Sequence, residues 1–369
     1  MKSEQPRIAS IDALRGADML LLAGGAEALR AVASSGGAPR LAEQLTHAAW
    51  AQPLTCWDMV MPLFIFIVGA SMPFAFAKYH ARGDSKVKML WRVLRRCVLL
   101  FLLGMLVQGQ LATAAPERMS LFCNTLQAIA EGYLIAAVCM MLGGVRTQII
   151  ACVTCLALYW GALRFIPYGG HEGGRFLPQD NLAIYIDHLL QGRWQDGTPY
   201  SWILTALSFG ALTLMGALGG QIIRRHARSW KAPAILLGIA LICMAAGWLA
   251  AFDTPMIKHI YTTSMTLWSG GLCFILLALF HLLFDKLPYA AKLALPLRVI
   301  GSNAILAYLL TQTPGLHGCS LWKSLCHPLF DGLASLAAPA SSVLFELLSL
   351  AALYLLLHFL YLHKAYLRV

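Results

Sequence analysis

The chain has few charged residues for its length. Only 12% of its 369 residues are Asp, Glu, Lys or Arg, whereas 59% are hydrophobic. A soluble domain usually carries about twice that share of charge. So much apolar surface cannot be buried in one globular core, so the composition predicts a polytopic membrane protein. Because neither a repeat of fixed period nor a soluble domain is seen, we expect residues 1–369 to form a single transmembrane domain.

Metal-binding spacings are missing as well. The eleven histidines include no His-x-x-x-His or His-Glu-x-x-His pattern. The ten cysteines contain one Cys-x-x-Cys pair, Cys152 and Cys155, inside an apolar segment with no second pair to complete a site. Most of the other cysteines also lie in apolar segments, where a small core residue is the usual role. We therefore expect no metal.

Positive charge is plentiful but dispersed. The net charge of +11 comes from short basic clusters between apolar segments. This distribution is typical of the cytoplasmic face of a membrane protein and not of a nucleic-acid-binding surface. The expected macromolecular environment is a lipid bilayer, and no nucleic acid is expected as a partner.

Apolar runs of about 17–25 residues predict an all-α bundle of about ten transmembrane helices. The expected spans are 14–33, 57–77, 90–111, 123–143, 147–165, 201–223, 232–252, 262–284, 299–313 and 341–362. The two longest connections, 166–200 and 314–340, are rich in Gly, Pro, Trp or His. Loops of this length are often functional, although each could also be a cap that shields the bundle.

The distribution of Lys and Arg predicts the orientation. With Met1 inside, 20 of the 28 basic residues lie on the cytoplasmic side and 8 on the other side. We therefore expect a multi-pass protein of a bacterial inner membrane with both termini in the cytoplasm. His47 then lies on the external side.

A histidine, two tryptophans and an aspartate gather at the external start of the second span: His47, Trp50, Trp57 and Asp58. A neutral imidazole can accept a proton from an amine or hydroxyl nucleophile, or attack an acyl group itself. A carboxylate on its other nitrogen would orient it, so we expect His47 and Asp58 to meet by folding of the loop. The tryptophans could line a sugar site or only anchor the interface, and Asp58 could simply cap a helix.

A second group lies at the cytoplasmic start of the first span. Asp12 and Arg15 are spaced to pair on one helix face. Arg15 could also hold a phosphate-bearing ligand, although a capped helix with a basic anchor explains the same residues.

Other polar residues recur near the ends of spans: Gln127, Asp187, Lys258 and Asn303. Each alone is more typical of an interhelical hydrogen bond than of a ligand contact. Their convergence on one cavity is a hypothesis.

Several short motifs follow one another along the chain: Ser-Ile-Asp-Ala-Leu-Arg-Gly at 10–16, His-x-x-Trp at 47–50, Trp-Asp-Met-Val-Met-Pro-Leu-Phe-Ile-Phe-Ile-Val-Gly at 57–69, Arg-Arg-Cys-Val-Leu-Leu-Phe-Leu-Leu-Gly at 95–104, Thr-Leu-Gln-Ala-Ile-Ala at 125–130, Pro-Met-Ile-Lys at 255–258, Thr-Thr-Ser at 262–264 and Ile-Gly-Ser-Asn-Ala-Ile at 300–305. Taken together, these motifs resemble the heparan-alpha-glucosaminide N-acetyltransferase family, in particular its bacterial branch of unknown function. The resemblance implies a membrane acyltransferase that passes acetyl from cytosolic acetyl-CoA to a terminal glucosamine amine across the membrane. It places the family's catalytic histidine on His47, and two further family residues on Asp58 and Asn303.

The chain departs from the family pattern at several positions. Ala51 follows Trp50 where the family has asparagine, Ala128 replaces an arginine, and Ile257 replaces an asparagine. These changes bear on the acceptor and on whether activity is retained.

The leading hypothesis is an acetyltransferase that uses acetyl-CoA and an amino sugar or related glycan. We expect His47 and Asp58 to be catalytic, Asp12, Arg15 and Asn303 to bind the coenzyme, and Trp50, Trp57, Gln127, Asp187 and Lys258 to bind the acceptor. One alternative is a polysaccharide O-acyltransferase, and another is a sugar transporter. The oligomeric state stays open, with a homodimer as one candidate.

Overall fold

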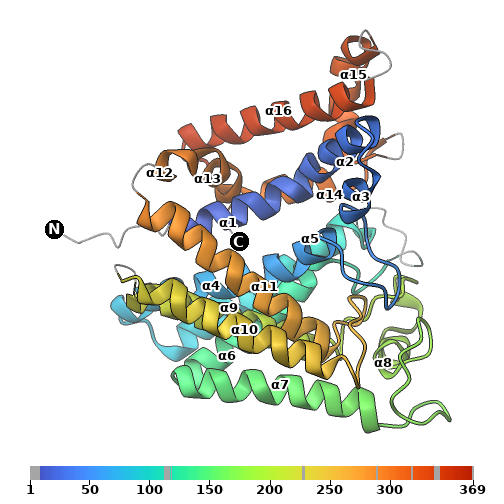
Figure 1. The fold of residues 1–369 in the computed structure, drawn as a ribbon, viewed down its shortest axis with the longest axis vertical. Helices are drawn as coiled ribbons and strands as arrows, with labels where there is room; N and C mark the ends of the chain where they lie inside the picture. Colours follow the sequence, from blue (N-terminus) through green and yellow to red (C-terminus); the bar gives the residue numbers. More distant parts are fainter. Residues whose placement is uncertain are drawn as a thin grey trace. The chain divides into compact units, whose positions relative to one another are not determined.

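The fold is all-α, as the composition predicted. The computed structural model describes residues 9–111, 117, 119–226, 229–287, 290–316, 319–335 and 341–367. Helices make up the regular structure of this part of the chain, in which no β-strand forms and three isolated bridges are present (Figure 1).

Seven helical segments in the described residues are long and apolar enough to cross a membrane. They are Trp57–Ala81, Thr125–Leu142, Val145–Phe165, Ala206–His226, Lys231–Ala250, Thr263–Lys286 and Ser341–Leu362. The predicted number of ten is not confirmed. Each of the seven contains one of the predicted spans nearly in full, and the chain is on this ground a multi-pass membrane protein.

The three remaining predicted spans differ for identifiable reasons. The first is interrupted: α1 (Ala9–Leu20) and α2 (Ala26–Ser35) are separated by the irregular turn Leu21–Gly25. The third, α5 (Lys86–Val107), is a continuous helix, but five Lys and Arg residues lie in its first eleven positions. The ninth is divided at Asn303 into α13 (Leu295–Ser302) and α14 (Ala304–Gln312).

Both connections expected to be loops contain helices. Segment 166–200 contains α8 (Leu182–Gln191), which begins where the Asn181 side chain accepts a hydrogen bond from the amide of Ile184 at 3.0 Å. Segment 314–340 contains α15 (Leu321–Ser335), with Pro328 inside it. Both helices are shorter than a membrane span, so a search for long apolar runs does not detect them.

The chain divides into two compact units. The first comprises residues 1–42, 225–237 and 275–368, and the second comprises 43–224 and 238–274 with residue 369. Helices α10 (Lys231–Ala250) and α11 (Thr263–His281) contribute to both units. The expectation of a single domain stays a prediction.

The second unit is built around α4 (Val60–Ala81), α6 (Thr125–Leu142) and α9 (Ala206–His226). A Cβ atom added at Gly69 of α4 would lie 2.0 Å from the carbonyl oxygen of Thr213, and one at Gly216 of α9 would lie 2.0 Å from that of Phe66. These glycines therefore let the two backbones touch, the usual packing device between apolar helices. Helix α7 (Val145–Phe165) packs against α6 and α8.

The first unit holds α1, α2 and the start of α3 (Pro39–Gln44) with α12 (Ala290–Leu293) to α16 (Ser341–Leu362). Helix α1 packs closely on α13, because Gly16 lies against the backbone of Leu297 and Gly301 lies against that of Asp12. Helix α16 contacts α2, α13 and α15 (Figure 1).

Candidate functional site

Asp58 lies in the short 3₁₀ turn Trp57–Met59 that leads into α4, and it bonds back to the residues before this turn. One of its carboxylate oxygens, Oδ2, accepts hydrogen bonds from the amide of Thr55 at 3.0 Å and from the amide of Ala48 at 3.2 Å. In return, the Thr55 hydroxyl accepts a bond from the Asp58 amide at 3.4 Å. This is the reciprocal pattern of a capping box, formed here by Thr-x-x-Asp. The helix-capping role considered for Asp58 is therefore present, and it occupies one oxygen.

The other oxygen of Asp58 contacts two basic side chains. Its Oδ1 atom lies 3.3 Å from Nδ1 of His47 and 2.9 Å from Nζ of Lys258. The Nζ atom of Lys258 also lies 2.6 Å from Nδ1 of His47. Asp58 is fully buried and the Lys258 side chain is 6% exposed, whereas the His47 side chain is 55% exposed. The three groups, all in the second unit, thus form a compact cluster with an accessible imidazole.

The opposite nitrogen of His47 contacts Trp57. The indole N–H of Trp57 lies 3.1 Å from Nε2, with the two rings edge to face at 5.9 Å between centroids. An indole N–H can only donate, so this bond requires a lone pair on Nε2. An ammonium on Lys258 can also only donate, and it requires the lone pair of Nδ1.

One neutral imidazole cannot accept at both nitrogens, so the contacts define two protonation states. In one, Nδ1 carries the hydrogen, Trp57 bonds to Nε2 and Lys258 is a neutral amine. In the other, Lys258 is an ammonium bonded to Nδ1, and the bond from Trp57 is lost. Burial lowers the pKa of Lys258, although the charge of Asp58 opposes this shift, which brings the two states closer in free energy. The two states differ by one proton in total, so the charge of Lys258 determines which nitrogen of His47 carries the hydrogen.

An aromatic wall lies beside this cluster. His259 stacks on Trp50 with 5.2 Å between ring centroids and packs against Tyr200 at 4.7 Å. The indole N–H of Trp50 is fixed by the carbonyl oxygen of Phe176 at 2.8 Å. Burial, and then the charge of Lys258, lower the pKa of His259, and burial raises the pKa of Tyr200 to about 12. Both groups are therefore uncharged near pH 7 and offer flat apolar faces of the kind on which sugars stack.

Two of the predicted acceptor-binding residues have their polar groups engaged elsewhere in the second unit. Gln127 completes the cap of α6: its Oε1 atom accepts from the amides of Cys123 and Asn124, and its Nε2 atom donates to the carbonyl oxygen of Leu121. The Asp187 carboxylate accepts from the amides of Trp202 at 2.6 Å and Ile203 at 3.0 Å. Both contacts support the chain around the site.

The three residues predicted to bind the coenzyme belong to the first unit. The guanidinium of Arg15 lies 3.7 Å from the carboxylate of Asp12, in the i, i+3 pairing expected from the sequence. Asn303 donates from Nδ2 to the carbonyl oxygen of Ala365 and accepts at Oδ1 from the amide of Leu367, each at 3.0 Å. The Asn303 side chain therefore holds the C-terminal segment beside the break between α13 and α14. Coenzyme binding by these residues stays a prediction.

Two residues around the imidazole were not anticipated: Thr55 and Tyr200. A signal for Thr55 was present, because Thr-x-x-Asp before an apolar run indicates a cap. His259 adjoins Lys258 near the start of the span predicted at 262–284, where polar residues were expected. For Tyr200 the sequence offers no such signal, because its contact with His259 depends on how distant segments fold.

One comparison with a known protein gives a significant similarity. The chain is 30% identical over 102 residues to heparan-alpha-glucosaminide N-acetyltransferase of Homo sapiens. The match spans 28% of this chain and 14% of that protein. No family model matches the chain. The similarity shows a distant relationship over part of the chain.

Proposed function

We propose that the protein is a membrane acyltransferase that transfers acetyl from acetyl-CoA to the amine of an amino sugar or related glycan, with His47 as the reacting group. The observation that carries this proposal is the contact of an accessible imidazole with a buried carboxylate and a buried lysine. The partial similarity to a protein named as an N-acetyltransferase supports the same reaction class.

Each residue of the cluster has a distinct role in this reaction. The acceptor amine attacks the thioester carbonyl, forming a C–N bond and breaking the C–S bond. The amine proton passes to Nε2 of His47 after Trp57 moves aside, and the leaving thiolate takes up a proton to give free coenzyme A. Asp58 stabilises the protonated imidazole through Nδ1–H, as carboxylates do beside other catalytic histidines.

Lys258 adjusts the charge of this pair. As a neutral amine, it leaves the hydrogen on Nδ1 and the lone pair on Nε2, so His47 can accept the proton of the acceptor amine and Asp58 then compensates the imidazolium. As an ammonium beside Nδ1, it places the hydrogen of the neutral imidazole on Nε2, and His47 cannot act as the base. We assign the aromatic wall of Trp50, His259 and Tyr200 to the acceptor sugar, because stacked uncharged rings suit its apolar face.

The proposed orientation follows the bias of basic residues. His47 would lie outside a bacterial inner membrane, both termini would lie in the cytoplasm, and Arg15 would attract the coenzyme phosphates. Cysteine labelling at positions 38–46 that succeeds only from the cytoplasmic side would contradict this topology.

The central test is acetyl transfer by the purified full-length protein in detergent. Labelled acetyl-CoA is mixed with glucosamine, a panel of other amines and polysaccharide hydroxyls, and the product and free coenzyme A are measured. His47→Ala should lose more than nine-tenths of the rate, because a proton-transfer group contributes about 10²–10⁴-fold. His80→Ala is the matched control, because His80 is exposed on α4.

Each outcome of the assay decides between named alternatives. Acetylated hydroxyls with no acetylated amine would identify an O-acyltransferase that uses the same donor. Label held by His47 and released by hydroxylamine would show an acetyl carrier instead of a general base. A rate unchanged in His47→Ala would refute the site.

A sugar transporter is the second candidate, and one observation favours it: the interruption of the first apolar helix at Leu21–Gly25. Broken helices line the binding sites of many transporters. Sealed vesicles containing the protein separate the two functions, because a transporter moves the sugar without changing it. Sugar uptake without coenzyme A release would replace the leading proposal.

A further inference from the structure

The interrupted helix of the first unit borders a polar cavity. Between α1 and α2 the backbone leaves helical geometry at Ala23 and at Gly24, where φ is +116°. A residue with a side chain rarely adopts such a φ, and glycine does so at little cost. The carbonyl oxygen of Leu22, beside the break, accepts a hydrogen bond from Nε2 of Gln312 at 3.2 Å. The break is thus stabilised from within the same unit.

The cavity has a volume of about 480 Å³, which lies in the range of small-molecule sites. Its lining comes from the break at Leu22–Gly24, the start of α2, the end of α14, the start of α15, and α16. All of these segments belong to the first unit. Irregular backbone in an apolar helix is tolerated where it lines a polar cavity, so the break and the cavity are parts of one feature.

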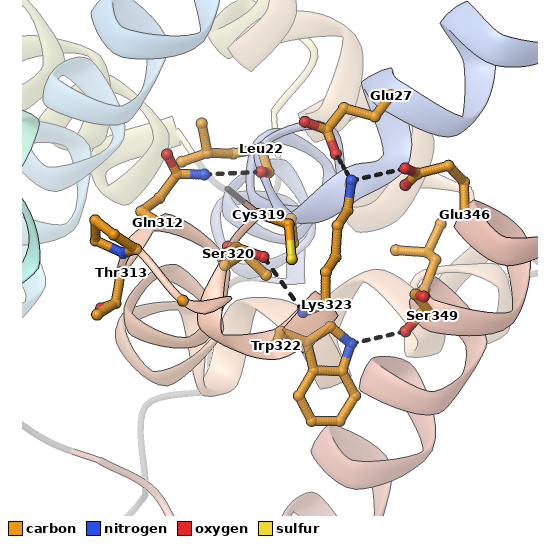
Figure 2. A pocket seen from close by; sticks show the side chains of 16 residues that line it. Leu22, Glu27, Gln312, Thr313, Cys319, Ser320, Trp322, Lys323, Glu346 and Ser349 are labelled. Atoms are coloured by element: carbon orange, nitrogen blue, oxygen red, sulfur yellow. Dashed lines mark hydrogen bonds and ion pairs between the residues drawn. The ribbon is translucent and has the colours of Figure 1, made fainter. Parts of the chain in front are cut away.

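Three charged residues line the cavity among the described residues: Glu27, Lys323 and Glu346. Figure 2 shows the Lys323 side chain between the two carboxylates, bonded to Glu27 and, at 2.7 Å, to Oε1 of Glu346. Burial opposes a charge on Lys323, but the two carboxylates outweigh it and raise the pKa of this lysine. Glu27, Lys323 and Glu346 together therefore have a formal net charge of −1.

The bonds to Lys323 leave acceptor capacity unused. Within the described part of the chain, each carboxylate uses one oxygen on Lys323 and keeps its second oxygen for another donor. The Ser349 hydroxyl, in a residue 3% exposed, has no hydrogen-bond partner at normal distance there, although it interacts with the weakly bonding thiol of Cys326. The indole N–H of Trp322 is taken by the Ser349 carbonyl oxygen at 2.8 Å, which fixes its ring in the lining (Figure 2).

We propose that this cavity binds a small organic molecule carrying a primary ammonium group, held by the second oxygens of Glu27 and Glu346. The residual negative charge selects a cation over an anion. The Lys323 ammonium between the carboxylates prevents them from closing on a divalent metal. The Trp322 ring adds attraction for a cation, and the Ser349 hydroxyl provides a further polar contact. None of the residues that line this cavity is among those assigned to acetyl transfer.

Calorimetry on the full-length protein in detergent tests this proposal with ethanolamine as the probe. Ethanolamine should bind, and ethylene glycol, which replaces the ammonium by a hydroxyl, should bind at least tenfold more weakly. Glu346→Gln should weaken ethanolamine binding at least tenfold, because a charge-assisted bond is lost. Glu43→Gln, at an exposed glutamate of α3, is the control and should leave it unchanged.

Further variants keep the test independent of folding defects. Glu27 is more exposed than Glu346, so Glu27→Gln offers a second route if Glu346→Gln does not fold. Lys323→Met removes the internal ammonium and should strengthen ethanolamine binding several-fold. His47→Ala should leave binding unchanged, so a failed acetyl-transfer assay would not affect this result.

The ammonium could come from a free amine or from a lipid headgroup. Nanodiscs containing phosphatidylethanolamine should reduce ethanolamine binding relative to phosphatidylcholine nanodiscs if a headgroup fills the cavity. Equal binding in both would identify a free amine as the source. Equal binding of ethanolamine and ethylene glycol, or no effect of Glu346→Gln and Glu27→Gln in folded protein, would overturn the proposal.

Discussion

The buried Lys258 and the half-buried Lys323 interact with carboxylates in opposite ways. Lys258 shares the carboxylate of Asp58 with an imidazole, and burial lowers its pKa. Lys323 bonds to two carboxylates, those of Glu27 and Glu346, and its pKa is raised. The residue type is the same, so the difference comes from the deeper burial of Lys258 and from its one carboxylate partner, against two for Lys323. Lys258 can therefore lose its proton at a lower pH than Lys323, which keeps its charge.

The largest expected effect comes from removing the shared carboxylate charge in the second unit. Asp58→Asn should reduce the rate of acetyl transfer by about 10²–10⁴-fold, because the imidazolium loses its counter-charge. Thr55→Ala is the control, since it removes the hydroxyl that bonds to the Asp58 amide, to Oδ2 of Asp58 and to the Thr46 carbonyl oxygen, and leaves the contacts of Oδ1 in place. If Thr55→Ala lowers the rate as much as Asp58→Asn, Asp58 acts through the helix cap and not through His47.

The comparison of the two lysines can be tested directly by chemical labelling. Because only a neutral amine reacts with an acylating reagent, Lys258 should become labelled at a lower pH than Lys323. Mass spectrometry of the intact protein after brief labelling across a pH series measures both sites in one sample. Lys78, which is exposed on α4, gives the reference profile. Labelling of Lys323 at a lower pH than Lys258 would contradict the proposed difference between the two lysines.

A smaller effect is expected on stability, through a carboxylate near the site. Burial, opposed by hydrogen bonds from the Ile203 and Trp202 amides, raises the pKa of Asp187 from 3.8 to about 6 in the folded protein. The folded state then binds more protons than the unfolded state between these pH values, so this group's contribution to stability falls as pH rises through that window.

Asp187→Asn should remove this pH dependence while keeping an acceptor oxygen for one of the two amides. The stability of the variant relative to the unchanged protein should therefore rise by roughly 2–3 kcal/mol between pH 4 and pH 7. Thermal unfolding of both proteins in the same detergent across the pH series measures the difference. A constant difference at all pH values would show that Asp187 is ionised throughout.

The fold was predictable wherever one local property decides the structure. Long apolar runs predicted the seven membrane-spanning helices, and the position of Asp58 before an apolar run suggested a cap. The interruption at Gly24 was missed, because 14–33 was read as one span although it contains four charged residues, and the pair Gly24–Gly25 was read as part of a helix. Amphipathic α8 and α15 were missed because they are too short to span a membrane.

The site was predictable only in part. The contact between His47 and Asp58 needs a loop of eleven residues to fold back, and chemistry alone suggested it. Lys258 lies 200 residues from Asp58 in the chain, so its place beside the imidazole depends on helix packing that local patterns do not encode. The group around Lys323 joins residues 296 and 23 positions apart, and no motif connects them.

The smallest expected effect concerns Trp57, which contacts the accessible imidazole of His47. Its indole N–H occupies the Nε2 lone pair of His47, the atom proposed to accept the proton. Trp57→Phe keeps an aromatic ring and removes the donor, so the lone pair is freed. Modification of His47 by diethyl pyrocarbonate should then become several-fold faster, while the rate of acetyl transfer changes only a few-fold. Trp91→Phe, at an exposed tryptophan of α5, should change neither rate. Unchanged modification in Trp57→Phe would mean that Trp57 does not hold Nε2 in solution, and the protonation state with an ammonium on Lys258 would be the resting one.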